Sequence, residues 1–142
     1  MAFKIFLDAN TVLDFALQRS GYEPCKTVIS WAEQGRITGL VSPTVVQICS
    51  YWIGKAYGVT KAKEIMIALL TSIRAVDTPH ETVLKALHVS MNDIEDALLY
   101  YTALHHAADF VISNDKAFQK VALPSLPVVS PKHFIDKFNT LK

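Results

Sequence analysis

The stretch FKIFLDANTVLDF, residues 3–15, decides how we expect this chain to fold. Its apolar run Phe3–Leu7 is typical of a buried strand, and Asp8 ends that run. Asn10 and Thr11 then stand at the turn where the strand hands over to a helix. Asp, Asn and Thr are all favoured helix caps. Asp8 is therefore either a cap alone or a functional carboxylate at the end of a strand.

Similar short apolar runs recur along the chain, and helical patterns lie between them. The further strands we expect are Gly39–Val41, Phe110–Ile112 and Pro127–Val129. Apolar residues at three- and four-residue intervals predict the helices Glu23–Gln34, Thr44–Tyr57, Thr60–Ser72, Glu81–His88 and Asp93–Ala108, and a last helix opened by Ser130-Pro131. Strands that alternate with helices are typical of parallel βαβ units. The sequence thus predicts an α/β fold with a covered, mostly parallel sheet, in one domain spanning residues 1–142.

The composition excludes several classes of protein. Of the 142 residues, 51% are hydrophobic and 19% charged, which argues against intrinsic disorder. No apolar run approaches the length of a membrane span, and no signal peptide is visible. Cys25 and Cys49 have no C-x-x-C partner, so they indicate core residues in a reducing compartment rather than a disulfide framework or a zinc site. We therefore expect a cytoplasmic protein with no membrane partner.

The formal net charge is only +1, but the charges are unevenly distributed. Between Lys85 and Lys116 there are five acids and no Lys or Arg, whereas five lysines and one acid follow Asp115. An acidic centre beside a basic tail suits a cation bound inside and a polyanion held outside. A solvated helix face and an ordinary Lys-rich terminus give the same distribution, so both interpretations stay open.

In a parallel sheet, ligands bind at the carboxyl ends of the strands. Three places therefore become candidates: Asp8 after the first strand, Ser42–Gln47 after the second, and Ser113-Asn114-Asp115 after the strand Phe110–Ile112. Asp115 has the same alternative as Asp8, because a turn or a cap after a strand also explains it.

A second pair of acids opens the helix predicted in MNDIEDALLYYTAL. Helical spacing puts Asp93 and Asp96 on one face together with Tyr100. Acids in a first turn also complement the helix dipole or complete a capping box without any further function. The face toward the core is expected to consist of Ile94, Ala97, Leu98, Tyr101 and Leu104.

Four carboxylates at one edge of the sheet would repel one another unless a cation lay among them. Mg²⁺ takes oxygen ligands, keeps several waters and is bound by one or two carboxylates together with substrate phosphate. Such an ion lowers the pKa of a bound water and stabilises charge on a phosphodiester. The acids Asp8, Asp93, Asp96 and Asp115 therefore predict metal-dependent nuclease chemistry. A Ser or Cys nucleophile has less support, because the chain has neither a G-x-S-x-G motif nor a Gly-rich phosphate loop.

The order FLDANTVLDF, SPTVVQI, DIEDALLYYTAL and FVISNDKAF resembles the PIN domain, a family of metal-dependent ribonucleases that includes the VapC-type toxins of bacterial toxin–antitoxin pairs. The resemblance runs from residue 3 to about residue 130. It implies a three-layer α/β/α sandwich and an endoribonuclease that uses Mg²⁺ or Mn²⁺ to cleave RNA phosphodiester bonds. The implied catalytic and metal-binding residues are Asp8, Asp96 and Asp115, with Asp93 as a further candidate, and the supporting residues are Asn10, Thr11, Gln47 and Asn114.

One residue departs from the family pattern. The family usually has a glutamate on the helix after the second strand, where Gln47 stands here. A glutamine keeps a carbonyl oxygen but loses the charge, which weakens affinity for Mg²⁺. Either Asp93 supplies the missing charge, or the matching position is displaced by a turn, or the activity is reduced.

Two other functions remain as alternatives. The first is a catalytically weak or inactive PIN-like module that binds RNA or a protein partner, and Gln47 is its main support. The second is a phosphohydrolase that uses Asp8 as a covalent nucleophile, in the manner of haloacid dehalogenases. That class has a second Asp where Asn10 stands here, and its chains are usually larger.

The resemblance also implies partners. Small toxins of this kind often pair as dimers and are blocked by an antitoxin peptide. We therefore expect RNA as the substrate, and an antitoxin protein and a second copy of the chain as candidate partners. The apolar helices at residues 44–72 are where we expect the partner surface. Trp31 and Trp52 fall on amphipathic helices and are expected in the core or at an interface rather than on a platform for nucleic acid.

Overall fold

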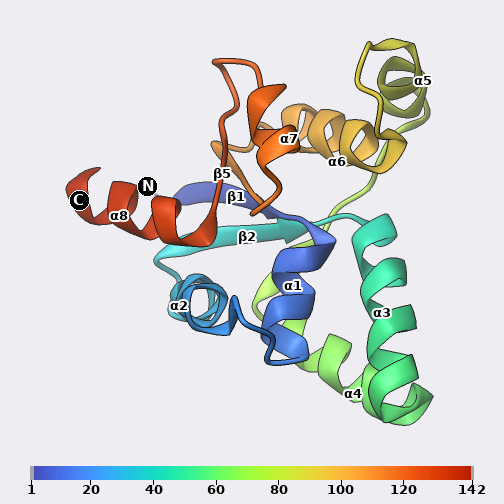
Figure 1. Ribbon diagram of the computed structural model, residues 1–142, viewed down its shortest axis with the longest axis vertical. Helices are drawn as coiled ribbons and strands as arrows, with labels where there is room; N and C mark the ends of the chain where they lie inside the picture. The colour runs from blue at the N-terminus through green and yellow to red at the C-terminus, as the bar shows by residue number, and fades with distance from the viewer. Residues whose placement is uncertain (1, 142) are drawn as a thin grey trace.

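The computed structural model describes residues 2–141, and these contain a five-stranded sheet with the order β3-β2-β1-β4-β5 (Figure 1). Every pair of neighbouring strands is parallel. The strands are β1 (Phe3–Leu7), β2 (Ile37–Val41), β3 (Ile73–Ala75), β4 (Phe110–Ile112) and β5 (Val128–Val129). The predicted α/β class with a mostly parallel sheet is confirmed.

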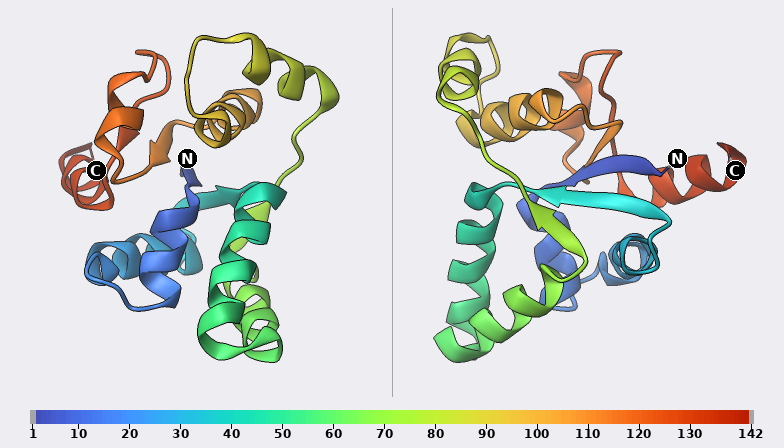
Figure 2. Two further views of the ribbon diagram at one scale, coloured as in Figure 1. Left: turned by 45° about the vertical axis from the view of Figure 1, so that its right-hand side comes forward. Right: turned by 180° about the vertical axis from the view of Figure 1, so that it is seen from behind.

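Helices cover both faces of the sheet and give the molecule three layers (Figures 1 and 2). The helices are α1 (Ala9–Ala16), α2 (Tyr22–Glu33), α3 (Pro43–Tyr57), α4 (Val59–Leu69), α5 (His80–His88), α6 (Ile94–His105), α7 (Lys116–Lys120) and α8 (Pro131–Leu141). Helices α1 to α4 lie on one side of the sheet, and α5, α6 and α7 lie on the other. This is the α/β/α sandwich that the resemblance to the PIN domain implies. No helix in the described part of the chain is long and apolar enough to span a membrane.

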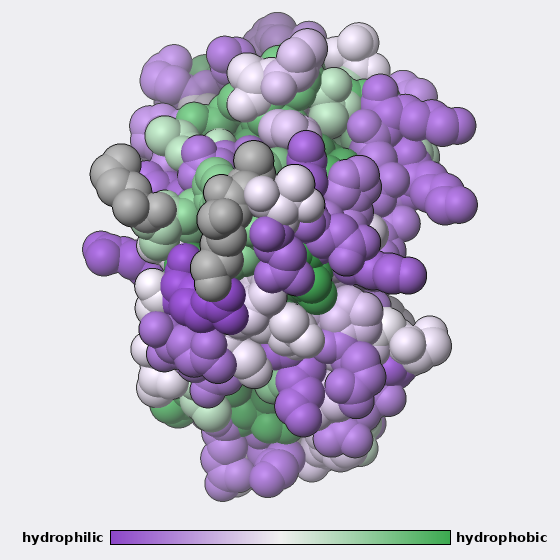
Figure 3. Space-filling view, turned by 90° about the vertical axis from the view of Figure 1, so that its left-hand side faces the viewer, coloured by the Kyte–Doolittle hydropathy of each residue, from purple (hydrophilic) through white to green (hydrophobic). Residues whose placement is uncertain are grey.

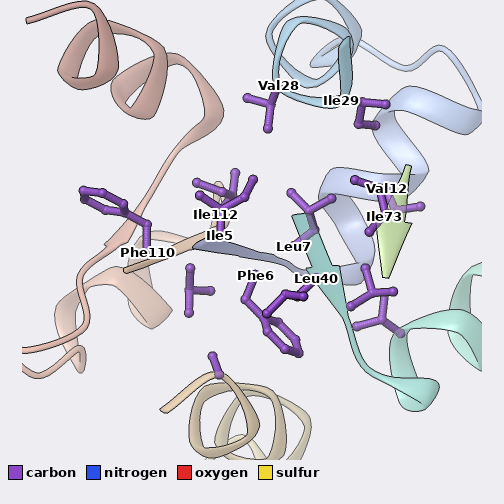
Figure 4. Close-up of a cluster of buried hydrophobic side chains, with 14 of the residues drawn as sticks. Ile5, Phe6, Leu7, Val12, Val28, Ile29, Leu40, Ile73, Phe110 and Ile112 are labelled. Atoms are coloured by element: carbon purple, nitrogen blue, oxygen red, sulfur yellow. The ribbon is translucent and has the colours of Figure 1, made fainter. Parts of the chain in front are cut away.

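The core lies in the centre of the sheet and between its helical layers. Ile5, Phe6 and Leu7 of β1 are completely buried. Side chains alternate between the two faces of a strand. In Figure 4, Ile5 and Ile112 therefore point toward Val28 of α2, whereas Phe6 points to the opposite side of the sheet. The apolar run at residues 3–7 is a strand because both of its faces are covered.

Helix α8 lies at the end of the molecule opposite to α3 (Figure 1). Its Phe138 ring lies 4.6 Å from the Trp31 ring of α2, so Trp31 is a core residue as predicted. Lys132 and Lys137 of this helix are exposed. The side of the molecule where α8 lies in Figure 1 shows many hydrophilic residues in Figure 3. The two lysines are therefore solvated, which fits both interpretations of the basic tail.

The strand register brings the ends of β1, β2 and β4 to the same edge of the sheet. Leu7 lies beside Ile112, and the Asp8 amide donates a hydrogen bond to the Ile112 carbonyl at 3.2 Å. Phe6 lies beside Leu40, one residue before the end of β2. The residues that follow these strands are thus neighbours in space, although they are far apart in the sequence.

Two elements were missed by the sequence patterns, and the ends of two helices were placed three residues too late, at Ser72 instead of Leu69 and at Ala108 instead of His105. Residues 70–72 were assigned to a helix, but α4 ends at Leu69 and the chain turns into β3. Only Ile73 of β3 is buried, so this edge strand has no apolar run that would reveal it. Helix α7 has only five residues, too few for a periodic pattern.

The core face of α6 also differs from the prediction. Ile94 is 59% exposed, whereas Tyr100 is 1% exposed and faces the interior. The Tyr100 hydroxyl donates a hydrogen bond to the Leu126 carbonyl and accepts one from the Leu123 amide, both at 2.7 Å. The helix is apolar on most sides, so its spacing did not distinguish the face that packs on the sheet from its neighbour.

We predict that Tyr100→Phe lowers the free energy of unfolding by about 1–3 kcal/mol, because it removes both hydrogen bonds and leaves the buried Leu126 carbonyl and the partly buried Leu123 amide without this partner. Urea denaturation measures this change. Tyr101→Phe is the matched control, since Tyr101 is only partly buried. Equal losses in the two variants would contradict the role assigned to the Tyr100 hydroxyl.

Candidate functional site

Asp8 begins the site, directly after β1. Its carboxylate oxygen Oδ1 accepts a hydrogen bond from the Thr11 amide at 2.8 Å, so Asp8 is the N-cap of α1. The Thr11 hydroxyl is buried and donates to the Ile112 carbonyl at 3.2 Å, which ties the first turn of α1 to β4. Burial raises the pKa of Asp8, and hydrogen bonds from Ser113 and Thr11 oppose that rise. Capping therefore coexists with an electrostatically unusual carboxylate.

Asp96 comes to the site from the first turn of α6. Asp93 is the N-cap of this helix and accepts a hydrogen bond from the Asp96 amide at 3.1 Å. The pKa of Asp96 is raised to about 7. Burial is the largest cause, and the negative charges of the neighbouring acids add to it, namely Asp93, Asp115, Asp8 and Glu95. Asp8, Asp93 and Asp115 thus lie close enough to Asp96 to disfavour its ionisation.

Asp115 follows β4 and caps α7. Its Oδ1 accepts hydrogen bonds from the Ala117 amide at 2.9 Å and the Phe118 amide at 3.2 Å. The Ser113 hydroxyl accepts a hydrogen bond from the Asp115 amide at 3.1 Å. Because Ser113 also hydrogen-bonds to Asp8, this one buried serine links the two acids.

A small cavity of about 60 Å³ lies between α1, α3 and α6. Asp8 and Asp96 line it together with Asn10 of α1. Ser42 closes it from the end of β2, where it caps α3 by accepting a hydrogen bond from the Val45 amide at 3.3 Å. The carboxylates of Asp8, which follows β1, and of Asp96 in α6 thus line one small space at the carboxyl edge of the sheet. We call this space the acidic cavity.

The structure separates the predicted site residues into groups. Asp8, Asp96 and Asn10 line the acidic cavity, whereas Asp93 and Asp115 act on Asp96 through their charges. Thr11 supports Asp8 from within the core. Gln47 and Asn114 are exposed.

Gln47 lines a neighbouring groove rather than the acidic cavity. Three residues of the site were not assigned a role from the sequence: Ser42, Ser113 and Glu95. Glu95 stands between two predicted site residues in the DIEDA segment, a signal that was available. The two serines lie in segments that the sequence had singled out after β2 and β4, but their parts in the site appeared only when the fold placed them beside the acids.

The donor set fits a hard divalent cation that keeps part of its water shell. Within residues 2–141, no three His, Cys, Asp or Glu side chains are arranged so that they could hold an ion by themselves. Mg²⁺ typically needs only one or two carboxylates, with water and substrate phosphate completing its shell. Asp8 and Asp96 both line the acidic cavity and are the residues that could supply these two carboxylates. The raised pKa of each shows that positive charge would be favourable beside them.

Arg19 fixes the position of Asn10 at the mouth of the cavity. Its Nε forms an ion pair with Oδ1 of Asp14 at 2.9 Å. Its Nη2 donates to the Asn10 backbone carbonyl at 3.2 Å and to the Asn10 side-chain oxygen at 3.3 Å. The side-chain oxygen of Asn10 is therefore engaged by Arg19, and the side-chain NH₂ group of Asn10 remains as a donor.

Comparison with known proteins identifies the family. A sequence model described as "PIN domain" matches residues 4–117, and no curated protein sequence matches the chain significantly. The chain belongs to the PIN domain family. The sequence-based assignment is confirmed.

Solved structures show the same fold. A chain in the crystal structure of VapBC2 from Rickettsia felis, bound to a DNA fragment from its promoter, is 15% identical with a TM-score of 0.65, covering 89% of this chain and 97% of that chain. VapC20 from Mycobacterium tuberculosis, a toxin that cleaves the sarcin-ricin loop, is 14% identical with a TM-score of 0.67, covering 87% of this chain and 98% of that chain. At these identities the likeness concerns the fold.

The raised pKa of Asp96 has a consequence for stability. The unfolded chain has an ordinary carboxyl pKa of 3.8 at this position, whereas the folded protein has about 7. Between these values the folded state binds more protons than the unfolded state. The contribution of this group to the free energy of unfolding therefore falls as the pH rises from about 4 to about 7 and stays low above that range.

We predict that Asp96→Asn stabilises the metal-free protein at about pH 8, by roughly 1–2 kcal/mol after allowance for solvent screening of a partly exposed group. At about pH 5 the effect should be clearly smaller, because Asp96 is then protonated in the folded state and the pH is only slightly above the carboxyl pKa of the unfolded chain. Thermal unfolding at both pH values measures the difference. Asp136→Asn, on an exposed part of α8, is the control. An equal effect of Asp96→Asn at both pH values would contradict the carboxylate repulsion.

Proposed function

We propose that this protein is a Mg²⁺- or Mn²⁺-dependent endoribonuclease. The observation that carries the proposal is the acidic cavity, where Asp8 and Asp96 lie together and the ionisation of Asp96 is opposed by burial and by four neighbouring acids. RNA as the substrate is supported by membership of the PIN domain family and by the fold shared with the RNA-cleaving toxin VapC20.

Each residue of the site has a distinct part in this proposal. Asp8 and Asp96 would hold the ion, which activates a water and stabilises charge on the phosphodiester. The negative charges of Asp93 and Asp115 act on Asp96, and in this proposal the two residues orient an incoming water or hold the ion's water shell. The Asn10 amide, held by Arg19, donates a hydrogen bond to the substrate. Ser113 keeps Asp8 and Asp115 in register.

We predict that the purified protein cleaves single-stranded RNA in the presence of Mn²⁺ or Mg²⁺ and loses this activity in EDTA. Asp8→Asn should remove most of the activity and keep the fold, because asparagine still caps α1 but lacks the metal-binding charge. Cleavage is followed on labelled RNA, and circular dichroism checks the fold. Asp136→Asn is the control and should cleave normally. Activity that survives both EDTA and Asp8→Asn would contradict the proposal.

The alternative is a PIN-like module that binds RNA or a protein without efficient cleavage. It is favoured by Gln47, which lacks the charge of the usual glutamate. The position of Gln47 in the neighbouring groove weakens this argument, because a residue outside the acidic cavity is not required there as a metal ligand. A folded protein that binds RNA but never cuts it with Mn²⁺ would support the alternative.

We predict that Gln47→Glu changes the affinity for Mn²⁺ by only about two-fold, since a solvent-screened charge outside the cavity contributes about 0.5 kcal/mol. A carboxylate inside the site would instead give a gain of roughly ten-fold, or about 1–2 kcal/mol, at an effective dielectric of about 20. Calorimetric titration with Mn²⁺ of both proteins distinguishes the two results. A ten-fold gain would mean that residue 47 belongs to the metal site.

We further propose that the protein is the toxin of a toxin–antitoxin pair and acts in the cytoplasm. Support comes from the VapBC2 and VapC20 structures, which share the fold. An antitoxin or a second copy of the chain would cover apolar side chains that α4 leaves exposed, namely Val59 and Ile67. A neighbouring gene for a small DNA-binding protein would support the toxin assignment, and a stand-alone gene would speak against it.

A further inference from the structure

A groove of about 480 Å³ adjoins the acidic cavity and opens to the surface. The cavity and the groove share Ala9 and Asn10 of α1, Ile48 of α3 and Glu95 of α6, so they are parts of one continuous depression. The remaining residues of the groove are Leu13, Gln47, Tyr51 and Trp52. We call it the aromatic groove.

Two large aromatic side chains on α3 line the aromatic groove and are largely in solvent. Tyr51 is 57% and Trp52 is 50% exposed, so the prediction that Trp52 lies in the core is excluded, and the interface prediction remains open. Their rings are 5.2 Å apart and nearly perpendicular, and Lys55 Nζ lies 5.6 Å from the Tyr51 ring centre. Adjacent exposed aromatic rings beside a polar cavity mark a binding surface.

We propose that the aromatic groove binds an unpaired base of single-stranded RNA next to the phosphate that enters the acidic cavity. The inference rests on the proposed function, because it takes RNA as the substrate. Trp52 supplies a stacking surface for the base, and the side chains of Asn10 and Gln47 lie where they can contact its polar edge.

The charge of the groove favours a base over a phosphate. Glu95 is the charged residue of its lining, and a carboxylate repels phosphate but accepts hydrogen bonds from the amino groups of bases. Asn10 presents its amide donor because Arg19 occupies its carbonyl oxygen. The neutral amide of Gln47 offers both a donor and an acceptor, which suits a base edge. The glutamine that departs from the family pattern thus has a function in this groove.

The position of the groove favours RNA over a protein segment. It is continuous with the cavity, so a strand whose phosphate reaches Asp8 and Asp96 must place a neighbouring nucleotide in or beside it. Three polar side chains interrupt its apolar lining, whereas an amphipathic helix needs a continuous apolar stripe. Tyr57, at the far end of α3, is half exposed but does not line the groove, so it provides a matched control.

Trp52 itself reports on binding. The other tryptophan, Trp31, is 7% exposed, so quenching of tryptophan fluorescence by an added oligonucleotide would come from Trp52. The probes are a short oligocytidylate and an oligomer of the same length with abasic sites in place of its bases, both in EDTA to prevent cleavage. We expect quenching by the oligocytidylate only, and no quenching in Trp52→Phe.

Binding of a fluorescently labelled oligocytidylate, measured by anisotropy, gives the affinities. Trp52→Ala should weaken binding roughly ten-fold, within the range for loss of one stacked base. Trp52→Phe should retain most of the affinity because it keeps an aromatic face, and Tyr57→Ala should bind like the wild type. Equal weakening by Trp52→Ala and Tyr57→Ala, or equal binding of the abasic oligomer, would overturn the proposal. Unchanged RNA binding in Trp52→Ala would also overturn it and would leave a protein partner as the occupant.

Cleavage assays with Mn²⁺ separate this proposal from the proposed function. If the wild type cleaves RNA and Trp52→Ala cleaves it equally well at limiting substrate, the groove proposal fails and the nuclease stands. If the oligocytidylate quenches Trp52 but RNA is never cut, the groove proposal stands and the nuclease fails.

Discussion

Repulsion between carboxylates at the carboxyl edge of the sheet is the constraint on which the site depends. The parallel register of β1 and β4 places Asp8 beside Ser113, and the first turn of α6 brings Asp96 to the same cavity. Burial and the neighbouring acids then raise the pKa of Asp96 to about 7. The fold thus holds negative charges together that would separate in a flexible chain, and a bound cation would relieve this repulsion.

The fold tolerates this repulsion because the acids also cap helices. Asp8, Asp93 and Asp115 each accept hydrogen bonds from amides in the first turn of a helix. Such bonds stabilise a carboxylate and complement the positive end of the helix dipole. Capping and metal binding were competing interpretations of the sequence, yet the structure shows the caps in place around the cavity. A cap residue at the end of a parallel strand is therefore well suited to become a ligand.

Sequence patterns predicted the parts of the fold that depend on local periodicity. The buried run at residues 3–7 and the acids after the strands identified the sheet and the edge where the site lies. They did not show β3, which has one buried residue, or the face of α6 that carries Tyr100, because that helix is apolar on most sides. The groove around Gln47 and Trp52 depends on how α1, α3 and α6 pack, which no local pattern records.

Diffraction at the manganese absorption edge, on crystals grown with Mn²⁺, tests the central claim most directly. The account predicts an anomalous peak in the acidic cavity, in contact with carboxylate oxygens of both Asp8 and Asp96. One or two carboxylates should suffice, with the remaining ligands being water. Manganese bound elsewhere on the protein while this cavity holds none would contradict the account.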